Sequence, residues 1–296
     1  MRNFGETIRH IRTNRGIKQN ELYTDILSKS YAIQFEKGLH DISFYLLLQI
    51  LDRFPMEVDE FLYLHRDYQE SESSWFYSSI GKFGNHNDLA ALKKFKQDYL
   101  SKYPNSEHQE ERLLQIDFRV EQLTFYYATG EIVGGTVEPQ IKEDIQKLLR
   151  NIQAWTMEDY RFFCNVMDLV DIFDMPQYFK LLLNSIDQYK DFEDGKPIIC
   201  TLLINGMTKL IFSNMLEEAV KILPVLNDFT KEINQMFYRN YYFFFKALVS
   251  LLKGNQDAIA KANRTIEIFR DLEYEFHAEI ADRILKEILS EADIQN

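Results

Sequence analysis

Apolar residues recur at intervals of three and four positions through nearly the whole chain, which is the spacing of one face of an α-helix. The stretch 255–272 shows the pattern clearly, because Ala262, Ile266 and Phe269 fall on one such face. Helix breakers are scarce, with six prolines and eleven glycines in 296 residues, and β-type alternation is rare. The sequence therefore predicts an all-α fold.

The expected helices are short at the N-terminal end and longer after it. We place the short ones near 4–14, 18–26, 29–36, 43–53 and 57–64. We place the long ones near 75–84, 87–102, 107–128, 139–153, 157–173, 176–190, 197–213, 215–229, 231–252, 256–272 and 274–290. Breaks are indicated at Pro104, 130–135, Glu193–Pro197, Asn214 and Gly254–Asn255. The polar stretch 66–74 lacks a hydrophobic face and is the expected linker, which separates a domain at 1–65 from a domain at 75–296.

The second domain has the pattern of a helical repeat. Helix pairs start near 157, 197 and 231, so they recur at roughly 34–40 residues, close to the tetratricopeptide period of about 34. The consensus tetratricopeptide side chains are absent, which makes the repeat tetratricopeptide-like, and an irregular helical bundle is the alternative. Stacked helix pairs form an α-solenoid with a concave groove.

The segment KQNELYTDILSKSYAIQFEK at 18–37 predicts a helix-turn-helix within the first domain. Ser28 can cap the second helix, whose first side chains would enter the major groove of double-stranded DNA. There Lys29 can pair with guanine and Gln34 with adenine. Arg12 and Arg15 can reach phosphates or the minor groove, although a solvated cationic face is the alternative for both. The candidate DNA-binding residues are Arg12, Arg15, Gln19, Ser28, Lys29, Ser30, Gln34 and Lys37.

Positive charge is concentrated at the N-terminal end of the chain. Residues 1–40 carry seven basic and four acidic groups, so they are net positive by three. The chain as a whole has a formal net charge of −12, which leaves −15 for the remainder. Because an acidic body repels phosphates, we expect DNA to contact the N-terminal domain alone.

Residues 4–64 resemble the N-terminal domain of Rgg/GadR/MutR-type regulators, most clearly in the segments IRTNRG, SKSYAIQFEKG and LLQILDR. The second domain resembles that family's repeat domain more loosely, around 151–165 and 202–205. The resemblance implies a cytoplasmic transcription regulator of Gram-positive type, working as a homodimer in quorum sensing. It also implies that the repeat domain binds a short, imported, hydrophobic signalling peptide. Some relatives have a cysteine in the fourth-helix region that could link protomers, but 41–54 contains none here.

Three asparagines are the candidates for holding a peptide backbone, because an amide side chain both donates and accepts hydrogen bonds. Asn165, Asn205 and Asn240 recur near the repeat period, each in a helix, where asparagine is unfavourable. Inward asparagines have this role in the related regulators, whereas hydrogen bonding between helices is the alternative. Arg161, Lys209 and Arg239 lie near these asparagines and could hold a peptide carboxylate, although a solvated position is the alternative for each. Phe237 and Phe244 could line hydrophobic pockets or lie in the core. The candidate peptide-binding residues are Arg161, Asn165, Asn205, Lys209, Phe237, Arg239, Asn240 and Phe244.

No sequence feature indicates catalysis, a metal or a cofactor. The six histidines form no HExxH pair, the two cysteines lack zinc spacing, and there is no glycine-rich phosphate loop or nucleophile elbow. Cys164 and Cys200 are expected to be buried and reduced, as in a cytoplasmic protein. No secretory signal or membrane span is indicated. The alternative function is a DNA-tethered adaptor whose solenoid docks a partner protein.

Overall fold

The computed structural model describes residues 3–129 and 137–294, and the all-α prediction is confirmed there. These residues form sixteen α-helices, four short 3-10 helices and no β-strand. The break expected at 130–135 lies outside the described residues. The chain divides into two compact units, residues 1–78 and 79–296.

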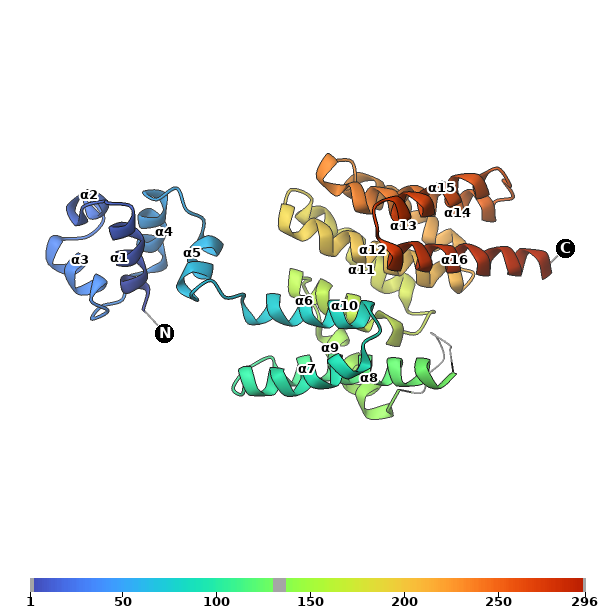
Figure 1. Cartoon of the computed structure of the whole chain (residues 1–296), viewed down its shortest axis with the longest axis horizontal. Coiled ribbons are helices and arrows are strands. Elements are labelled where there is room, and N and C mark those ends of the chain that lie inside the picture. Colours follow the sequence, from blue (N-terminus) through green and yellow to red (C-terminus); the bar gives the residue numbers. More distant parts are fainter. Residues whose placement is uncertain (1–2, 130–136, 295–296) are drawn as a thin grey trace. The chain divides into compact units, whose positions relative to one another are not determined.

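The first unit holds the predicted short helices (Figure 1). They are α1 (Phe4–Asn14), α2 (Gln19–Tyr23), α3 (Lys29–Glu36), α4 (Phe44–Asp52) and α5 (Val58–His65). The second is shorter than the expected 18–26, because Asp25 takes a left-handed φ of 64° and turns the chain toward α3. Ser28 and Ser43 cap α3 and α4 as expected, each accepting from the backbone N–H three residues on.

Close packing of α1 on α3 fixes the position of the second helix of the helix-turn-helix. Ile8, Leu22 and Phe35 are almost completely buried in the core of this unit. Gly5 lies at the crossing, where a Cβ atom would come within 1.7 Å of the Phe35 carbonyl oxygen. Only a glycine allows the two helix backbones to approach this closely. The orientation of α3 therefore depends on α1.

The second unit contains the long helices. Their bounds are α7 (Leu89–Lys102), α8 (Gln109–Thr129), α9 (Pro139–Asn151), α10 (Met157–Val166), α11 (Met175–Ile186), α12 (Lys196–Phe212), α13 (Leu216–Phe229), α14 (Met236–Leu252), α15 (Ala258–Asp271) and α16 (Glu275–Ile294). Before them, α6 (Glu72–Asn85) starts inside the stretch expected as a linker, and the boundary between the units falls within this helix. Left-handed φ values at Asn214 and Gly254 end α12 and α14, as the sequence indicates.

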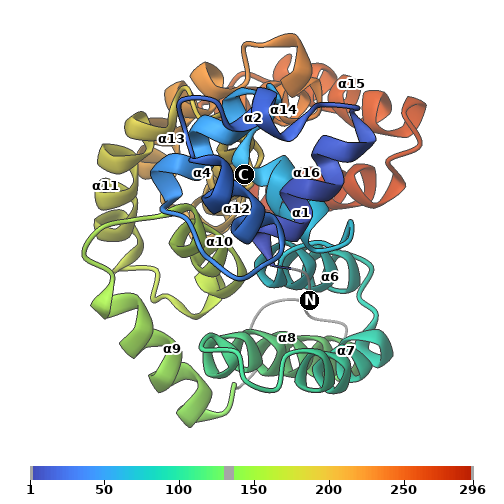
Figure 2. The same ribbon diagram turned by 90° about the vertical axis from the view of Figure 1, so that its left-hand side faces the viewer.

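The helices of the second unit form two layers of an α-solenoid. The inner series α8, α10, α12, α14 and α16 is continuous, since each of these helices contacts the next. Figure 2 shows α9, α11, α13 and α15 on the outside of this curve. The inner helices α10, α12, α14 and α16 begin at Met157, Lys196, Met236 and Glu275. The tetratricopeptide-like arrangement is confirmed, with a repeat near the upper end of the predicted range.

The helix expected over 157–173 is shorter than predicted. It ends at Val166 and continues as one 3-10 turn, Met167–Leu169. The Lys209 ammonium of α12 donates to the carbonyl oxygens of Met167 and Val170, both at 2.7 Å. A cation at a helix C-terminus satisfies carbonyls that lack intrahelical partners. Lys209 therefore stabilises this early end.

Within the described residues, no helix is both long and apolar enough to cross a membrane.

Candidate functional site

A buried carboxylate ties together the helix-turn-helix. Glu36 is 4% exposed and accepts two hydrogen bonds from the Arg12 guanidinium, at 2.7 and 2.8 Å. Gln19 Nε2 and the Tyr23 hydroxyl also donate to it, both at 3.0 Å. Burial raises the pKa of Tyr23, so its hydroxyl remains a donor. Arg12 and Gln19 thus join α1 and α2 to α3, and we leave both out of the proposed DNA contacts.

The other predicted DNA-binding residues are accessible. Lys29 and Ser30 are exposed in the first turn of α3, and Gln34 is half-buried one turn further along. Ser28 caps that helix with an exposed side chain. Arg15 is exposed but donates to the Phe54 carbonyl oxygen at 2.6 Å, which holds its guanidinium near α4. The structure therefore leaves Arg15, Ser28, Lys29, Ser30, Gln34 and Lys37 as the candidate DNA interface.

The second unit encloses a cavity of about 740 Å³ on the concave side of the solenoid. All five inner helices contribute to its wall. Phe118 and Phe125 come from α8, Ile204 and Phe212 from α12, and Ile280 from α16. A cavity of roughly 300–1,000 Å³ with mostly apolar walls and a few polar groups is typical of a ligand site.

Three of the predicted peptide-binding residues line this cavity, namely Asn205, Lys209 and Phe237. Asn205 is exposed, whereas Lys209 and Phe237 are half-buried. Burial lowers the pKa of Lys209, partly offset by Asp168 and Asp171. A peptide in the cavity would thus meet an amide, an ammonium and an aromatic ring.

Three of the predicted peptide-binding residues, all on α14, lie outside this cavity. Phe244 is completely buried in the core, and Asn240 is 7% exposed with its Nδ2 donating to the Thr265 carbonyl oxygen of α15 at 2.8 Å. Arg239 bonds Asn227 of α13 and stacks on the rings of Tyr242 and Phe243. None of the three lines the cavity as the structure describes it. For Asn240 the hydrogen bond between helices, the alternative weighed from the sequence, is the observed one.

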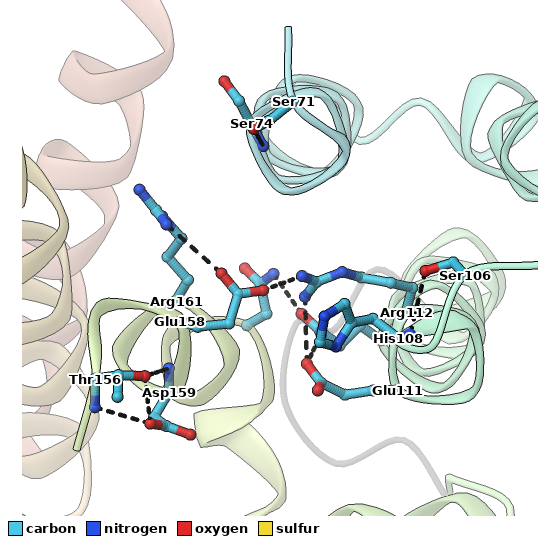
Figure 3. A network of polar contacts seen from close by, with 12 residues as sticks. Ser71, Ser74, Ser106, His108, Glu111, Arg112, Thr156, Glu158, Asp159 and Arg161 are labelled. Atoms are coloured by element: carbon cyan, nitrogen blue, oxygen red, sulfur yellow. Dashed lines mark hydrogen bonds and ion pairs between the residues drawn. The ribbon is translucent and has the colours of Figure 1, made fainter. Parts of the chain in front are cut away.

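Arg161 belongs to a polar network between α8 and α10 (Figure 3), and Asn165 bonds between the same two helices. Glu158 lies between Arg161, at 3.6 Å, and the buried Arg112, to which it is also paired. Asn165 Nδ2 donates to Gln115 Oε1 at 2.9 Å. One residue turns a helical side chain by roughly 100°. Cys164 therefore lines the cavity while Asn165, the next residue, faces α8.

Several residues of the cavity wall were not predicted from the sequence. Arg119 of α8 and His277 of α16 contribute polar groups, and Tyr241 places its hydroxyl 2.8 Å from His277 Nδ1. Burial lowers the pKa of both Arg119 and His277. One signal was available for Arg119, because it interrupts the apolar stripe formed by Ile116 and Leu123. No local signal marks His277, which joins the site only through the curvature of the solenoid.

The family model for the C-terminal domain of the HTH-type transcriptional regulator Rgg matches residues 92–282. The chain belongs to the Rgg family of transcriptional regulators. It is similar over 98% of both chains to a crystal structure of a candidate transcriptional regulator from Listeria monocytogenes EGD-e, with 28% identity and a TM-score of 0.85.

Two more distant structures share the fold of this Rgg-family chain. The Streptococcus dysgalactiae SHP pheromone receptor Rgg2 has 16% identity and a TM-score of 0.73, with 96% of this chain and 99% of that chain covered. The PrgX/cCF10 complex has 21% identity and a TM-score of 0.65, with 96% and 98% covered. The family is one of transcriptional regulators and not of enzymes. Among the described residues, no cluster of three metal-ligating side chains occurs.

Proposed function

We propose that this Rgg-family regulator binds double-stranded operator DNA through its first unit and a short hydrophobic peptide through the cavity of its second unit. Peptide binding changes the affinity for the operator, as in quorum sensing, and the protein acts in the cytoplasm. The observation that carries the proposal is the 740 Å³ cavity whose wall comes from every inner helix of the solenoid. A ligand that contacts all these helices favours one curvature over another, in proportion to its differential affinity.

The DNA part of the proposal rests on α3. Its N-terminal turn exposes Lys29 and Ser30, while the Glu36 network fixes the helix against α1 and α2. Exposed cations beside a rigid recognition helix suit both phosphate contact and base recognition. The proposed contacts are Arg15, Ser28, Lys29, Ser30, Gln34 and Lys37.

The peptide part rests on the size and chemistry of the cavity. Its volume lies in the usual range for sites that enclose a small ligand. A folded partner protein would instead need an open surface of about 800 Å². The similar folds support this choice, because Rgg2 is an SHP pheromone receptor and another neighbour is a bacterial peptide pheromone/receptor complex. Asn205, Lys209 and Phe237 are the proposed contacts. The cavity size disfavours the adaptor alternative.

We also propose a homodimer, with dimerisation contacts in the second unit. One helix-turn-helix covers a single half-site, and two-fold dimers that bind two half-sites are the usual solution. The chain has a mass of 35.3 kDa, so light scattering of the purified protein should give about twice that value. A mass near that of one chain at micromolar concentration would contradict the dimer.

The test of function is co-purification. The full chain, purified from its native host, should carry short hydrophobic peptides that mass spectrometry identifies. Adding such a peptide should change the affinity for promoter DNA in an electrophoretic mobility assay. Retention of folded proteins in place of peptides would instead support the adaptor.

A further inference from the structure

We propose that the ligand of the cavity carries a carboxylate that binds between Arg119 of α8 and Lys209 of α12, and that its apolar end lies against α14 and α16. The inference rests on the proposed function, because it assigns a chemistry and a direction to the peptide. Arg119 and Lys209 then determine specificity, since they select for the charge of the ligand.

Both cations lie on the cavity wall, and their hydrogen-bond partners among the described residues are neutral. Lys209 donates to two backbone carbonyl oxygens, and an ammonium has a third N–H group available. Arg119 donates from Nη2 to the Gly84 carbonyl oxygen at 2.8 Å and from Nη1 to Gln122 Oε1 at 3.1 Å. Neither forms an ion pair with a carboxylate among the described residues. Both side chains are therefore held in place without a direct ion pair to a described carboxylate.

Three other cations with little exposed surface, all among the described residues, have carboxylate partners. Arg12 pairs with Glu36 at 2.7 Å, and Arg112, which is 1% exposed, pairs with Glu111 and Glu158. Lys196, whose side chain is 7% exposed, pairs with Glu193 and Glu232. Removing a charge from water is costly unless an opposite charge compensates it. An anionic group of the ligand would supply this compensation for the two cations of the cavity.

The two acidic residues of the wall do not replace that group. Asp168 is exposed and accepts a hydrogen bond from Gln122 Nε2 at 2.9 Å. Glu121 accepts from the backbone N–H of Glu138 at 2.8 Å. Burial lowers the pKa of both Arg119 and Lys209 although Asp168 opposes the shift in each case. The acids thus neutralise the two cations incompletely.

The part of the cavity wall that α14 and α16 contribute is mostly apolar. Helices α14 and α16 contribute Phe237, Tyr241, Phe276 and Ile280 to the wall, and their one titratable base is His277. Burial lowers the pKa of His277, so its ring is neutral near pH 7. The His277 ring lies among aromatic rings, with its centroid 4.8 Å from that of Phe237. This part of the wall suits an aromatic or aliphatic side chain.

The experiment uses the purified full chain and three mixed libraries of apolar synthetic octapeptides. The first has free C-terminal carboxylates, the second has C-terminal amides, and the third has amides with one aspartate at a varied position. Peptides retained through gel filtration are quantified by mass spectrometry. We expect the first or the third library to be retained roughly tenfold better than the second, which is typical of one charge-assisted hydrogen bond. Better retention of the first library identifies a C-terminal carboxylate, and better retention of the third identifies a side-chain carboxylate.

Two variants and a matched control test whether Arg119 and Lys209 cause the preference for a carboxylate. Arg119→Met and Lys209→Met should each abolish the preference for a carboxylate, measured as the ratio of retention between the libraries. An unchanged helical circular-dichroism signal shows that the variants are folded. Arg239→Met removes a half-buried cation outside the cavity and should keep the preference. A photoreactive phenylalanine analogue at the end remote from the carboxylate should cross-link to α14 or α16.

The possible outcomes separate the carboxylate inference from the proposed peptide-binding function. Equal retention of all three libraries overturns the carboxylate inference and leaves the peptide-binding function standing. A preference that persists in both cavity variants, or cross-links to α8, also overturns the inference. Retention of no library overturns the proposed function and the inference together.

Discussion

The core of the first unit and the cavity wall of the second differ in the partners of their cations. In the first, the guanidinium of Arg12 meets the carboxylate of Glu36 in a network that includes Gln19 and Tyr23. In the second, Arg119 and Lys209 on the cavity wall have neutral partners among the described residues. Both arrangements join helices, but only the first supplies a carboxylate, and this difference is the basis of the proposal that Arg119 and Lys209 bind an anionic group of the ligand.

The largest expected effect breaks the neutralised pair. Glu36→Ala leaves the guanidinium of Arg12, which is 13% exposed, without a counter-charge. Loss of one partner of such a pair typically costs about 3–5 kcal/mol. Hydrogen exchange of the α1–α3 amides should accelerate, and operator binding should fall with it. Tyr23→Phe is the control, because it removes one hydrogen bond to the same carboxylate and should cost only about 1 kcal/mol. Equal protection in Glu36→Ala and the wild type would contradict the structural role of the pair.

The second effect tests helix packing beside the cavity. A Cβ atom at Gly206 of α12 would come within 1.9 Å of the Phe179 ring, whose residue is 4% exposed. Gly206→Ala should therefore lower the free energy of unfolding by about 1–3 kcal/mol, the usual cost of overpacking. Gly81→Ala in α6 is the matched control, because nothing lies within 4 Å of its Cβ position. Denaturant titration followed by circular dichroism measures both, and a neutral Gly206→Ala would contradict the tight contact.

The third effect tests the exposed cations of the first unit. Lys29→Ala and Arg15→Ala should each weaken operator binding roughly tenfold, the loss of one good base or phosphate contact, with an unchanged helical circular-dichroism signal. Lys253→Ala, an exposed cation of the second unit, should have no effect. Full operator binding by the fragment 67–296 would refute the assignment of DNA to the first unit.

The fourth effect distinguishes two asparagines with similar spacing. Asn205→Ala should weaken peptide binding by about 0.5–1.5 kcal/mol, up to roughly tenfold, and leave the DNA affinity of the peptide-free protein unchanged. Asn240→Ala removes a hydrogen bond to α15, so it should lower the melting temperature without a specific effect on the peptide. Titration calorimetry with a co-purified peptide separates them, and wild-type affinity in Asn205→Ala would remove Asn205 from the site.

The smallest effect concerns pH. Burial lowers the pKa of His277, so below about pH 6.5 the unfolded chain takes up a proton that the folded chain resists. The free energy of unfolding should therefore decrease as the pH falls from about 7 to about 5. His277→Phe removes that titration, so its melting temperature should depend less on pH than that of the wild type. Identical pH profiles of His277→Phe and the wild type would show that the His277 ring is hydrated and not buried in the cavity wall.

The fold and the helix-turn-helix of the first unit were largely predictable from the sequence. Helical periodicity located the helices, and the local spacing of Ser28 and Lys29 located the start of α3. Both depend on residues within a few turns of one another. The network around Glu36 was not predictable, because its partners come from three helices. Arg12 and Gln19 therefore have roles that their positions in the sequence do not indicate.

The candidate ligand site was predicted only in part. Asn165, Asn205 and Asn240 recur near the repeat period, yet they occupy the ninth, tenth and fifth positions of α10, α12 and α14. Since each position turns a side chain by roughly 100°, the tenth position faces another direction than the ninth and the fifth, and Asn205 alone lines the cavity.

The sequence by itself determined that this chain is all-α, with a basic helix-turn-helix before an acidic helical repeat. Those properties follow from periodicity and charge, which act locally or as totals. Only the tertiary structure decided which side chains share a wall, which cations are neutralised, and that Arg119 and His277 face the same cavity. The physical reason is that these relations join helices far apart in the chain, whose rotation and curvature are set by packing between neighbours.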